Sequence, residues 1–193
     1  YVVPFLAYVL VLPFFSIFFD SNIPYLLHVV ASAGLLALFW RRYRLRFRFD
    51  AVAILAGLLV FVIWVGLEGA YPLLFRISYV PGNNFFLATK IFGFVLLAPV
   101  MEELFTRGFL TRFLVSKHWR LVPVGKFTPF SFIATALFFG IAHDRWLAGI
   151  VAGIILNMLL YKQKSVESCI VAHFTANLLL TAYIVATSSW SMW

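Results

Sequence analysis

The sequence has little charge and almost no cysteine. Charged residues make up 11% of its 193 residues, whereas hydrophobic residues make up 64%, and soluble domains are nearer a quarter charged and half apolar. This composition excludes a water-soluble domain, and it excludes disorder, which requires low hydrophobicity and high charge. The single cysteine, Cys169, excludes an internal disulfide and a zinc site built from several cysteines. The class that remains is a membrane protein built of spanning helices.

The apolar residues gather in runs that are long enough to form membrane helices. We expect an all-α fold, a polytopic transmembrane bundle of seven spanning helices, or eight if the loop-like stretch 71–88 hides another. Several runs are shorter than the ~20 residues of a full crossing, so some helices should break or stop part-way. We treat 1–193 as a single integral membrane domain with a motif-bearing core at 89–188. The seven runs are 1–19, 24–40, 51–69, 89–115, 129–143, 146–161 and 166–188.

The net charge of +8 comes from basic residues that lie between the apolar runs. This placement follows the positive-inside rule, and we therefore expect no nucleic-acid partner. If the runs alternate in direction, Arg76, Lys90 and Arg145 lie on one side, and the basic stretch 41–48 on the other side suits contact with anionic lipid headgroups. The residues predicted on the cytoplasmic side are Arg41, Arg42, Arg44, Arg46, Arg48, Arg107, Arg112, Lys117, Arg120, Lys126, Lys162 and Lys164.

Two adjacent glutamates, Glu102 and Glu103, lie inside the fourth run, where ionisable side chains are costly and are therefore functional candidates. On a helix, Glu103 and Arg107 are four residues apart and can form an ion pair. Glu102 lies about 100° further round the helix and can face another direction. The pattern predicts one supported carboxylate and one available carboxylate, which is a candidate general base. The alternative is a buried ion pair that only fixes helix packing.

Two histidines and an asparagine lie in later runs. His143 follows Phe139 by four residues, so the phenyl ring can stack on the imidazole and orient it. His173 and Asn177 are also four residues apart and share one helix face. Counted from the nearest loops, Glu102, His143 and Asn177 lie about 21 Å from one membrane level. The same count places His173 at about 15 Å, so the four side chains can share one layer of the bundle.

This set of side chains suits the hydrolysis of an amide bond. A carboxylate and a histidine, here Glu102 and His143, can hold and deprotonate a water molecule. A second histidine, His173, and the amide of Asn177 can donate hydrogen bonds to the oxyanion of a tetrahedral intermediate. We therefore predict hydrolysis without a covalent intermediate, in a membrane cavity whose low dielectric strengthens these interactions.

Three segments in order resemble the motifs of one family. Residues 102–107, EELFTR, are similar to the EExxxR motif of the CAAX protease and bacteriocin-processing (CPBP, or Abi) intramembrane proteases. Residues 139–143, FGIAH, resemble the FxxxH motif of that family, and residues 173–177, HFTAN, resemble its HxxxN motif. The family includes the type II CAAX prenyl endopeptidases and bacteriocin-processing or immunity proteins.

Further segments resemble a bacterial subgroup, the CAAX prenyl protease-related proteins that are associated with exosortase protein-sorting systems. These segments are 123–132, 146–149 and 190–193. The resemblance implies a location in the bacterial inner (cytoplasmic) membrane and an exosortase-system partner. It also implies that the substrate is a peptide near a membrane-embedded protein tail rather than a prenylated protein.

The family resemblance implies an all-α membrane fold and a glutamate-type, metal-independent intramembrane endopeptidase without a cofactor. It implies that Glu102 and His143 activate water, and that His173 and Asn177 form the oxyanion site. The expected partners are membrane lipids and a membrane-associated protein or peptide substrate. The supporting residues that the resemblance implies are Glu103, Arg107 and Phe139.

Two other hydrolytic readings use the same region. A zinc protease could use His143, His173 and a glutamate, since two histidines and a carboxylate form a known catalytic zinc set. The sequence has no HExxH spacing, and Asn177, four residues after His173, is a poor zinc ligand. A thiol protease could use Cys169, four residues before His173, although a buried free cysteine usually acts as a small hydrophobic residue.

A non-enzymatic reading also fits the composition. Membrane glutamates and histidines serve proton relays, and a scaffold or immunity protein can keep a polar cluster for helix specificity. The absence of an inverted repeat argues mildly against a transporter. Because a scaffold tolerates Glu102→Gln and a protease does not, this substitution separates the two classes.

Several other polar or small residues have structural interpretations. Gly149 and Gly153 form a GxxxG pattern, which predicts close helix packing. Asn157 on the same run is expected to form a hydrogen bond to a neighbouring helix. His28 and Glu68 lie near the ends of their runs, and we expect them at the membrane interface rather than in a catalytic site.

Overall fold

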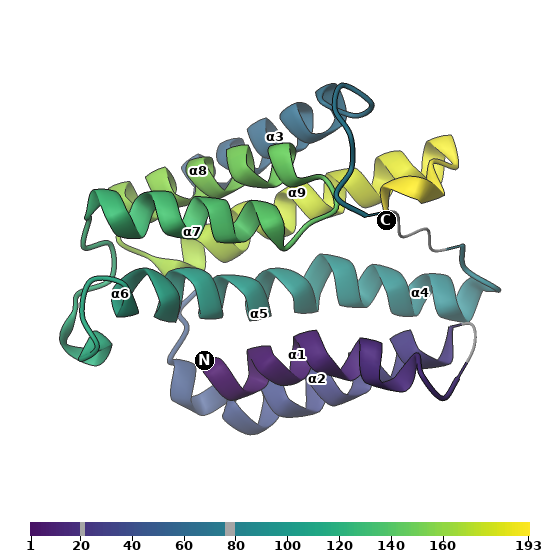
Figure 1. The fold of residues 1–193 in the computed structure, drawn as a ribbon, viewed down its shortest axis with the longest axis horizontal. Coiled ribbons are helices and arrows are strands. Elements are labelled where there is room, and N and C mark those ends of the chain that lie inside the picture. The colour runs from purple at the N-terminus through teal and green to yellow at the C-terminus, as the bar shows by residue number, and fades with distance from the viewer. Residues whose placement is uncertain (20–21, 76–79) are drawn as a thin grey trace.

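The computed structural model describes residues 1–19, 22–75 and 80–193. Arg76, which the charge pattern assigned to the extracytoplasmic side, lies outside these residues. Within the described ranges the chain is helical and contains no strand. The all-α prediction is therefore confirmed, and the helices are arranged as a polytopic bundle (Figure 1).

Each of the seven apolar runs corresponds to a helical segment. The fourth run forms one long helix over Asn84–Phe113, in which two π-helical turns interrupt the α-helix. In chain order the elements are α1 (Val2–Phe15), α2 (Ile23–Tyr43), α3 (Ala51–Gly66), α4 (Asn84–Phe92), η1 (Gly93–Leu97), α5 (Ala98–Phe105), η2 (Thr106–Leu110), α6 (Thr111–Phe113), η3 (Trp119–Leu121), α7 (Pro129–Ile141), α8 (Trp146–Gln163), α9 (Val166–Thr187) and η4 (Trp190–Met192).

The helices fall into two length classes. Among the described residues, α2, the long helix, α8 and α9 have 21, 30, 18 and 22 residues and are long and apolar enough to cross a membrane. The remaining apolar helices, α1, α3 and α7, have 14, 16 and 13 residues. The predicted mixture of full and shortened helices is therefore present, and the protein is an integral membrane protein.

Side-chain caps explain where two helices begin. The side chain of Asn83 accepts a hydrogen bond from the backbone N–H of Phe86, so the long helix begins at residue 84. This start corrects the sequence prediction, which placed 84–88 in a loop. Thr128 caps α7 in the same way, and Pro129 at its first position is pre-shaped for a helix start.

Asp50 joins the starts of two helices on the basic side of the bundle. One carboxylate oxygen accepts a hydrogen bond from the backbone N–H of Ala53 and caps α3, and the other accepts a 2.6 Å hydrogen bond from Ser168 on α9. Partial burial acts to raise the pKa of Asp50, but these hydrogen bonds hold it below its ordinary value. The ionised carboxylate therefore stabilises this junction.

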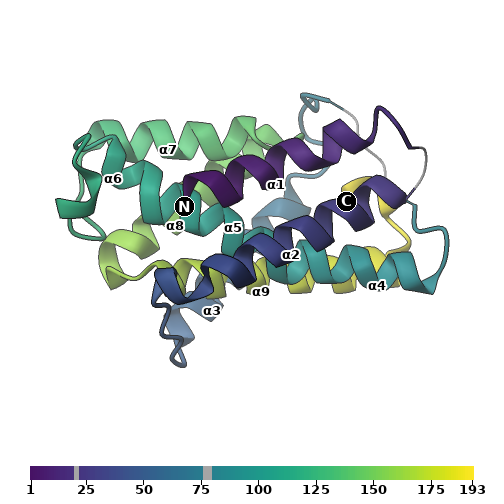
Figure 2. The ribbon, with the colours of Figure 1, turned by 90° about the horizontal axis from the view of Figure 1, so that it is seen from below.

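The long helix lies between two layers of helices (Figure 1). On one side, α1 packs against α2, and Figure 2 looks onto this pair where it covers the long helix. On the other side, α7 packs against α8 and α3 packs against α9. The residues of the fourth run can therefore face both layers, which places them at the centre of the bundle.

The predicted close packing at the GxxxG pattern is confirmed. A Cβ added to Gly149 would lie 3.0 Å from Cα of Gly140, and one added to Gly153 would lie 3.0 Å from Cα of Ala136. Larger residues would therefore separate α7 from α8. Asn157 forms the predicted helix-to-helix hydrogen bonds, since its amide donates to two groups on α7.

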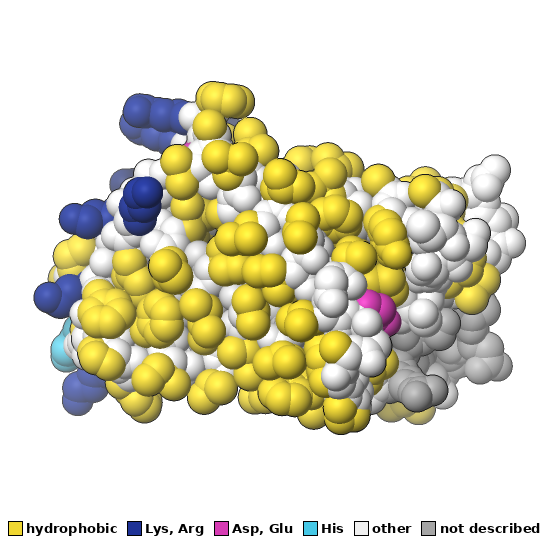
Figure 3. All heavy atoms as spheres, turned by 90° about the horizontal axis from the view of Figure 1, so that it is seen from above, with side chains coloured by type: hydrophobic (Ala, Val, Ile, Leu, Met, Phe, Trp, Pro, Cys, Tyr) yellow, Lys and Arg dark blue, Asp and Glu magenta, His cyan; other side chains and the backbone are white. Residues whose placement is uncertain are grey.

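Basic side chains and hydrophobic side chains occupy different parts of the surface. Figure 3 shows lysine and arginine side chains gathered at one end of the molecule and hydrophobic side chains spread over its flank. This asymmetry agrees with the positive-inside pattern of the sequence. Arg107 is an exception, because its side chain is fully buried and does not contribute to the charged surface.

Candidate active site

A cavity of about 370 Å³ opens between the two layers of helices, within the size range of ligand sites. Its wall is mainly apolar and comes from α1, α2, α3, the long helix, α7, α8 and α9. Glu102, His143, His173 and Asn177 all line this cavity. The structure therefore brings together the four side chains that the sequence placed in one layer.

Glu103 and Arg107 lie behind the cavity wall and are both fully buried. Arg107 donates a 3.0 Å hydrogen bond to Oε1 of Glu103, as the four-residue spacing predicted, and a 3.3 Å hydrogen bond to the carbonyl of Gly153. Its guanidinium also lies 4.5 Å from the centre of the Phe139 ring. These contacts tie the long helix to α7 and α8 around a single buried charge pair.

The buried pair extends to His173 on α9. Nδ1 of His173 lies 2.9 Å from Oε1 of Glu103, and the ring of Phe139 packs edge-on to the imidazole at 5.6 Å. Glu103 is a carboxylate acceptor, so Nδ1 carries the proton that it shares with this oxygen. The Glu103 carboxylate therefore fixes the orientation of His173, which leaves Nε2 as the ring nitrogen without this bond.

Glu102 and His143 face each other across a short gap in the cavity. Oε2 of Glu102 lies 3.8 Å from Nε2 of His143, too far for a direct hydrogen bond. Nδ1 of His143 lies 2.6 Å from the carbonyl of Phe139, which can only accept, so this nitrogen carries a proton, and in the neutral ring Nε2 has a lone pair. The Phe139 ring contacts His143 with the ring centres 4.7 Å apart and the ring planes tilted by 40°, so the predicted contact forms without parallel stacking.

A tyrosine from the N-terminal layer also reaches Glu102. The hydroxyl of Tyr8 on α1 donates to Oε1 of Glu102 at 3.4 Å. On the opposite side, the ring of Trp64 on α3 meets His143 edge-on at 5.5 Å. The exposed fractions of Glu102 and His143 are 18% and 23%, so both side chains remain open to the cavity.

Asn177 connects α9 to the first π-helical turn. Its amide donates a 2.8 Å hydrogen bond to the carbonyl of Phe94. Pro99 follows this turn and has no N–H to donate back into it, which is consistent with an irregular helix at this point. The bond uses one of the two amide hydrogens of Asn177 and leaves the other for the cavity.

A family model of Rce1-like type II CAAX prenyl endopeptidases matches residues 83–179, half of the chain. The chain belongs to this family. No curated protein and no solved structure matches this chain. This membership agrees with the resemblance of the three motifs, and it identifies the chain as a membrane-embedded protease of the CAAX endopeptidase type.

In this Rce1-like protein, an ion-pair cluster lies directly after His143, which the sequence analysis did not find. Arg145 binds both oxygens of Glu68 at 2.5 and 2.7 Å, binds Asp144 at 2.7 Å, and donates to the carbonyl of Ser191. Burial acts to lower the pKa of Arg145, but the two carboxylates raise it above its ordinary value. The cluster fixes the turn that follows His143 and joins it to the last residues of the chain.

The expectation that His28 lies at the membrane interface is wrong. His28 is 6% exposed and lines the cavity, together with Lys90 and Tyr8. Its position near the start of α2 suggested an interface, but α2 packs across the long helix and turns this residue inward. Both His28 and Tyr8 come from helices that precede the family match at 83–179. No motif signal could therefore have identified them.

In the ranges 1–19, 22–75 and 80–193, no group of three or more His, Cys, Asp or Glu side chains is placed to hold a metal ion. Cys169, the residue of the thiol-protease alternative, is fully buried, and its thiol donates to the carbonyl of Leu156. It does not line the cavity that contains Glu102.

Proposed function

We propose that this protein is a glutamate-type intramembrane endopeptidase that hydrolyses a peptide bond in a membrane-associated protein or peptide without a metal. The main support is one observation. Oε2 of Glu102 and Nε2 of His143, which has a lone pair in the neutral ring, face each other 3.8 Å apart in the cavity. Both atoms are acceptors, so one water molecule can donate its two hydrogens to them and direct its lone pairs toward a substrate carbonyl.

The first step forms a bond from the water oxygen to the carbonyl carbon. As this bond forms, Glu102 takes a proton from the water, and His143 holds the water in place through Nε2. The carbonyl oxygen becomes an oxyanion. Glu102 then returns the proton to the leaving nitrogen as the carbon–nitrogen bond breaks, which yields an acid and an amine and regenerates the carboxylate.

The oxyanion is stabilised by His173 and Asn177. For His173 to donate from Nε2 while Nδ1 bonds Glu103, the ring must carry a proton on both nitrogens. The second amide hydrogen of Asn177 is the other donor, and its bond to Phe94 holds the amide in place. Donors held in this way act strongly because they are already oriented before the reaction.

The same proposal includes the location, the substrate and the partner of the enzyme. We place the enzyme in the bacterial inner membrane as one integral membrane domain over residues 1–193, with a membrane-associated peptide as substrate and an exosortase-system protein as partner. Lysine and arginine at one end of the bundle would face the cytoplasm. The cavity would then receive substrate from within the bilayer.

The proposal is tested by comparing protein termini in membranes. The host's own membranes, carrying wild type or Glu102→Gln at equal expression, are analysed by mass spectrometry with and without a zinc chelator. Glu167→Gln is the matched control, because Glu167 lies in the first turn of α9 and does not line the cavity. We expect new termini with wild type and Glu167→Gln, none with Glu102→Gln, and no effect of the chelator.

The other readings give different outcomes in the same experiment. Termini that disappear on chelation and return with added zinc would overturn the metal-independent mechanism. The absence of new termini with both wild type and Glu102→Gln would overturn the protease assignment for this copy and favour a scaffold or immunity role. A wild-type signal that Glu102→Gln leaves intact would overturn the assignment of Glu102.

A further inference from the structure

His143 lies just beyond the end of α7 rather than within it. The helix ends two residues earlier, and the turn 142–145 leads to the start of α8. The backbone N–H of His143 donates to the carbonyl of Gly140 at 3.0 Å, and its Nδ1 lies 2.6 Å from the carbonyl of Phe139. Both contacts reach back to α7, so the far side of the turn requires separate support if the imidazole is to keep its place in the cavity.

Arg145 supplies this support at the far end of the turn. Its side chain is 2% exposed, and its guanidinium binds both carboxylate oxygens of Glu68, at 2.5 and 2.7 Å. The same guanidinium donates to Asp144 at 2.7 Å and to the carbonyl of Ser191 at 3.0 Å. A planar guanidinium that binds a carboxylate through two nitrogens fixes direction as well as distance. Arg145 therefore holds the turn against the end of α3 and against η4.

The ion pair of Arg145 and Glu68 joins the same two segments as a ring contact of His143. Glu68 directly follows α3 and lies four residues, about one helical turn, after Trp64. The Trp64 ring meets the His143 ring edge-on at 5.5 Å. His143 and Arg145, two residues apart on the turn, thus contact two residues that are neighbours along α3. A shift of the ion pair would therefore move the His143 ring relative to Trp64.

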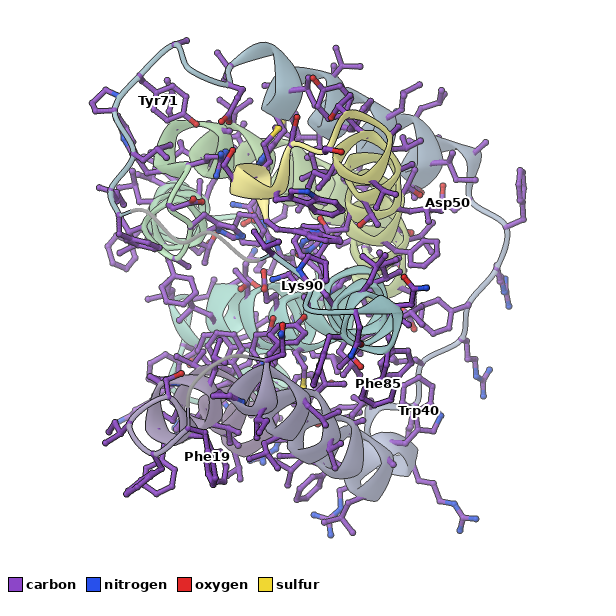
Figure 4. The ribbon with its side chains drawn as sticks, turned by 90° about the vertical axis from the view of Figure 1, so that its right-hand side faces the viewer. Phe19, Trp40, Asp50, Tyr71, Phe85 and Lys90 are labelled. Carbon is purple, nitrogen blue, oxygen red and sulfur yellow. The ribbon has the colours of Figure 1, made fainter. Side chains whose placement is uncertain are left out.

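The loop that follows α3 adds contacts to the same part of the chain. The backbone N–H of Leu74 donates to the carbonyl of Asp144 at 3.0 Å. The hydroxyl of Tyr71 accepts a 3.1 Å hydrogen bond from the backbone N–H of Ala148, in the first turn of α8. In the end-on view of Figure 4, Tyr71 lies on this loop at the edge of the bundle. The loop therefore supports the turn at the edge, whereas the buried Arg145 supports it from inside.

We infer that Arg145 is a positioning residue for His143, and that it acts through Glu68 and the turn rather than by touching the substrate. Arg145 itself does not line the cavity. Water activation depends on the 3.8 Å spacing between Oε2 of Glu102 and Nε2 of His143, and a displacement of about 1 Å can lower a rate by about 10²-fold. This inference rests on the proposed protease function, because it concerns the geometry of that reaction.

A double-mutant cycle separates this role from a purely structural one. The four proteins are wild type, Arg145→Gln, His143→Ala and the double variant. Their kcat is measured on a substrate identified from the new termini and is expressed per mole of folded protein, with the folded fraction taken from size-exclusion chromatography. If Arg145 acts through His143, its loss has no further effect once the imidazole is absent, because the two residues are coupled.

We expect Arg145→Gln to lower kcat by about 10–10²-fold with little change in KM, because the reaction geometry is lost while the cavity remains. In the His143→Ala background the same change should lower kcat by less than about twofold. Arg145→Lys keeps the charge but loses the two-pronged contact, and it should recover only part of the loss.

Two further variants make the cycle independent of how Arg145→Gln folds. Glu68→Gln leaves Arg145 paired with Asp144, and it should give a smaller fall in kcat that also disappears in the His143→Ala background. Arg120→Gln is the matched control, because Arg120 is exposed and lies outside the cavity. This control should leave kcat unchanged in both backgrounds.

A second measurement follows His143 without any proteolysis. Histidine labelled with ¹⁵N is incorporated, and ring nitrogens are observed by NMR in nanodiscs at about pH 8, where an ordinary imidazole is neutral. The His143 resonances are those missing from His143→Ala. The contact between Nδ1 and the Phe139 carbonyl predicts a single tautomer, protonated at Nδ1, in wild type and in Arg120→Gln. Arg145→Gln should give a mixture of both tautomers, because the ring loses its fixed orientation.

Equal losses of kcat with and without His143 would overturn the positioning role, since a purely structural effect does not depend on the imidazole. A His143 spectrum that is the same in wild type and Arg145→Gln would also overturn it. A spectrum that responds to Arg145 while wild type cleaves no substrate would overturn the proposed function and keep the positioning role. Cleavage by Arg145→Gln with the kcat of wild type would overturn the positioning role alone.

Discussion

Oε1 of Glu103 lies 2.9 Å from Nδ1 of His173, a contact that joins two motifs 70 residues apart in the chain. The same oxygen accepts a hydrogen bond from Arg107. One buried carboxylate therefore holds the arginine and the histidine at the same time. Glu102, its neighbour in sequence, is left to face the cavity, so the adjacent glutamates have separate structural tasks.

The buried pair of Glu103 and Arg107 should be essential for stability. Arg107→Met leaves the Glu103 carboxylate buried without its main partner, and breaking a buried pair costs about 3–5 kcal/mol. We expect a clear fall in the free energy of unfolding, measured by thermal or denaturant unfolding in detergent. The control is Arg41→Met at the exposed end of α2, where a change within about 0.5 kcal/mol is expected. A similarly small change for Arg107→Met would contradict this role.

Asn177 should act in the reaction rather than in folding. Asn177→Ala removes one oxyanion donor, and such a loss lowers kcat by about 10²–10³. Steady-state kinetics on a substrate identified from the new termini should show this fall with little change in KM. Asn157→Ala is the matched control, because the Asn157 amide donates a hydrogen bond to α7 outside the cavity. This substitution should reduce stability, whereas the protein that still folds should keep its kcat. A kcat for Asn177→Ala within threefold of wild type would count against the oxyanion assignment.

Tyr8 should tune the reactivity of Glu102. Its hydroxyl donates to the Glu102 carboxylate at 3.4 Å, so Tyr8→Phe removes one hydrogen bond to the proposed base. A single bond of about 0.5–1.5 kcal/mol corresponds to a change in kcat of about 2–13-fold. We expect kcat to change within that range while the unfolding temperature stays constant, and Tyr161→Phe outside the cavity should change neither. An unchanged kcat would show that Tyr8 has no part in catalysis.

Asp50 should make stability depend on pH in the acid range. Because its pKa is lower in the folded protein than its ordinary value near 4, the ionised carboxylate favours the folded state. This contribution is fully present above the unfolded pKa and is lost as pH falls through the folded pKa. Unfolding temperatures measured from pH 7 to pH 3 should fall less steeply for Asp50→Asn than for wild type. Parallel curves would show that Asp50 is not linked to folding.

Much of the fold could be predicted from hydrophobicity. Each apolar run became a helix, because in a bilayer the backbone must satisfy its own hydrogen bonds. The start of the long helix was predicted too late, since Asn83 and Pro81 looked like loop residues and the cap formed by Asn83 could not be distinguished from a turn. Local pairs such as Glu103 and Arg107 were predicted correctly because their spacing follows directly from helix geometry.

The contacts between distant helices could not be predicted in the same way. The ion pair of Arg145 with Glu68 joins two turns that are 77 residues apart, and no spacing rule connects them. His28 was misplaced because its distance from the helix end does not determine which neighbour the helix face meets. Such residues require the packing of the bundle to be known first.

The central claim is that Glu102 activates water without a metal, and it is tested most directly by the kcat of purified Glu102→Gln. The assay uses a cleaved substrate, a zinc chelator throughout, and a binding measurement to confirm that the variant still holds the peptide. The account predicts that kcat falls by about 10²–10⁴, the usual contribution of a general base, while substrate affinity is preserved. Glu102→Gln with near wild-type kcat, or wild-type activity that needs added zinc, would contradict it.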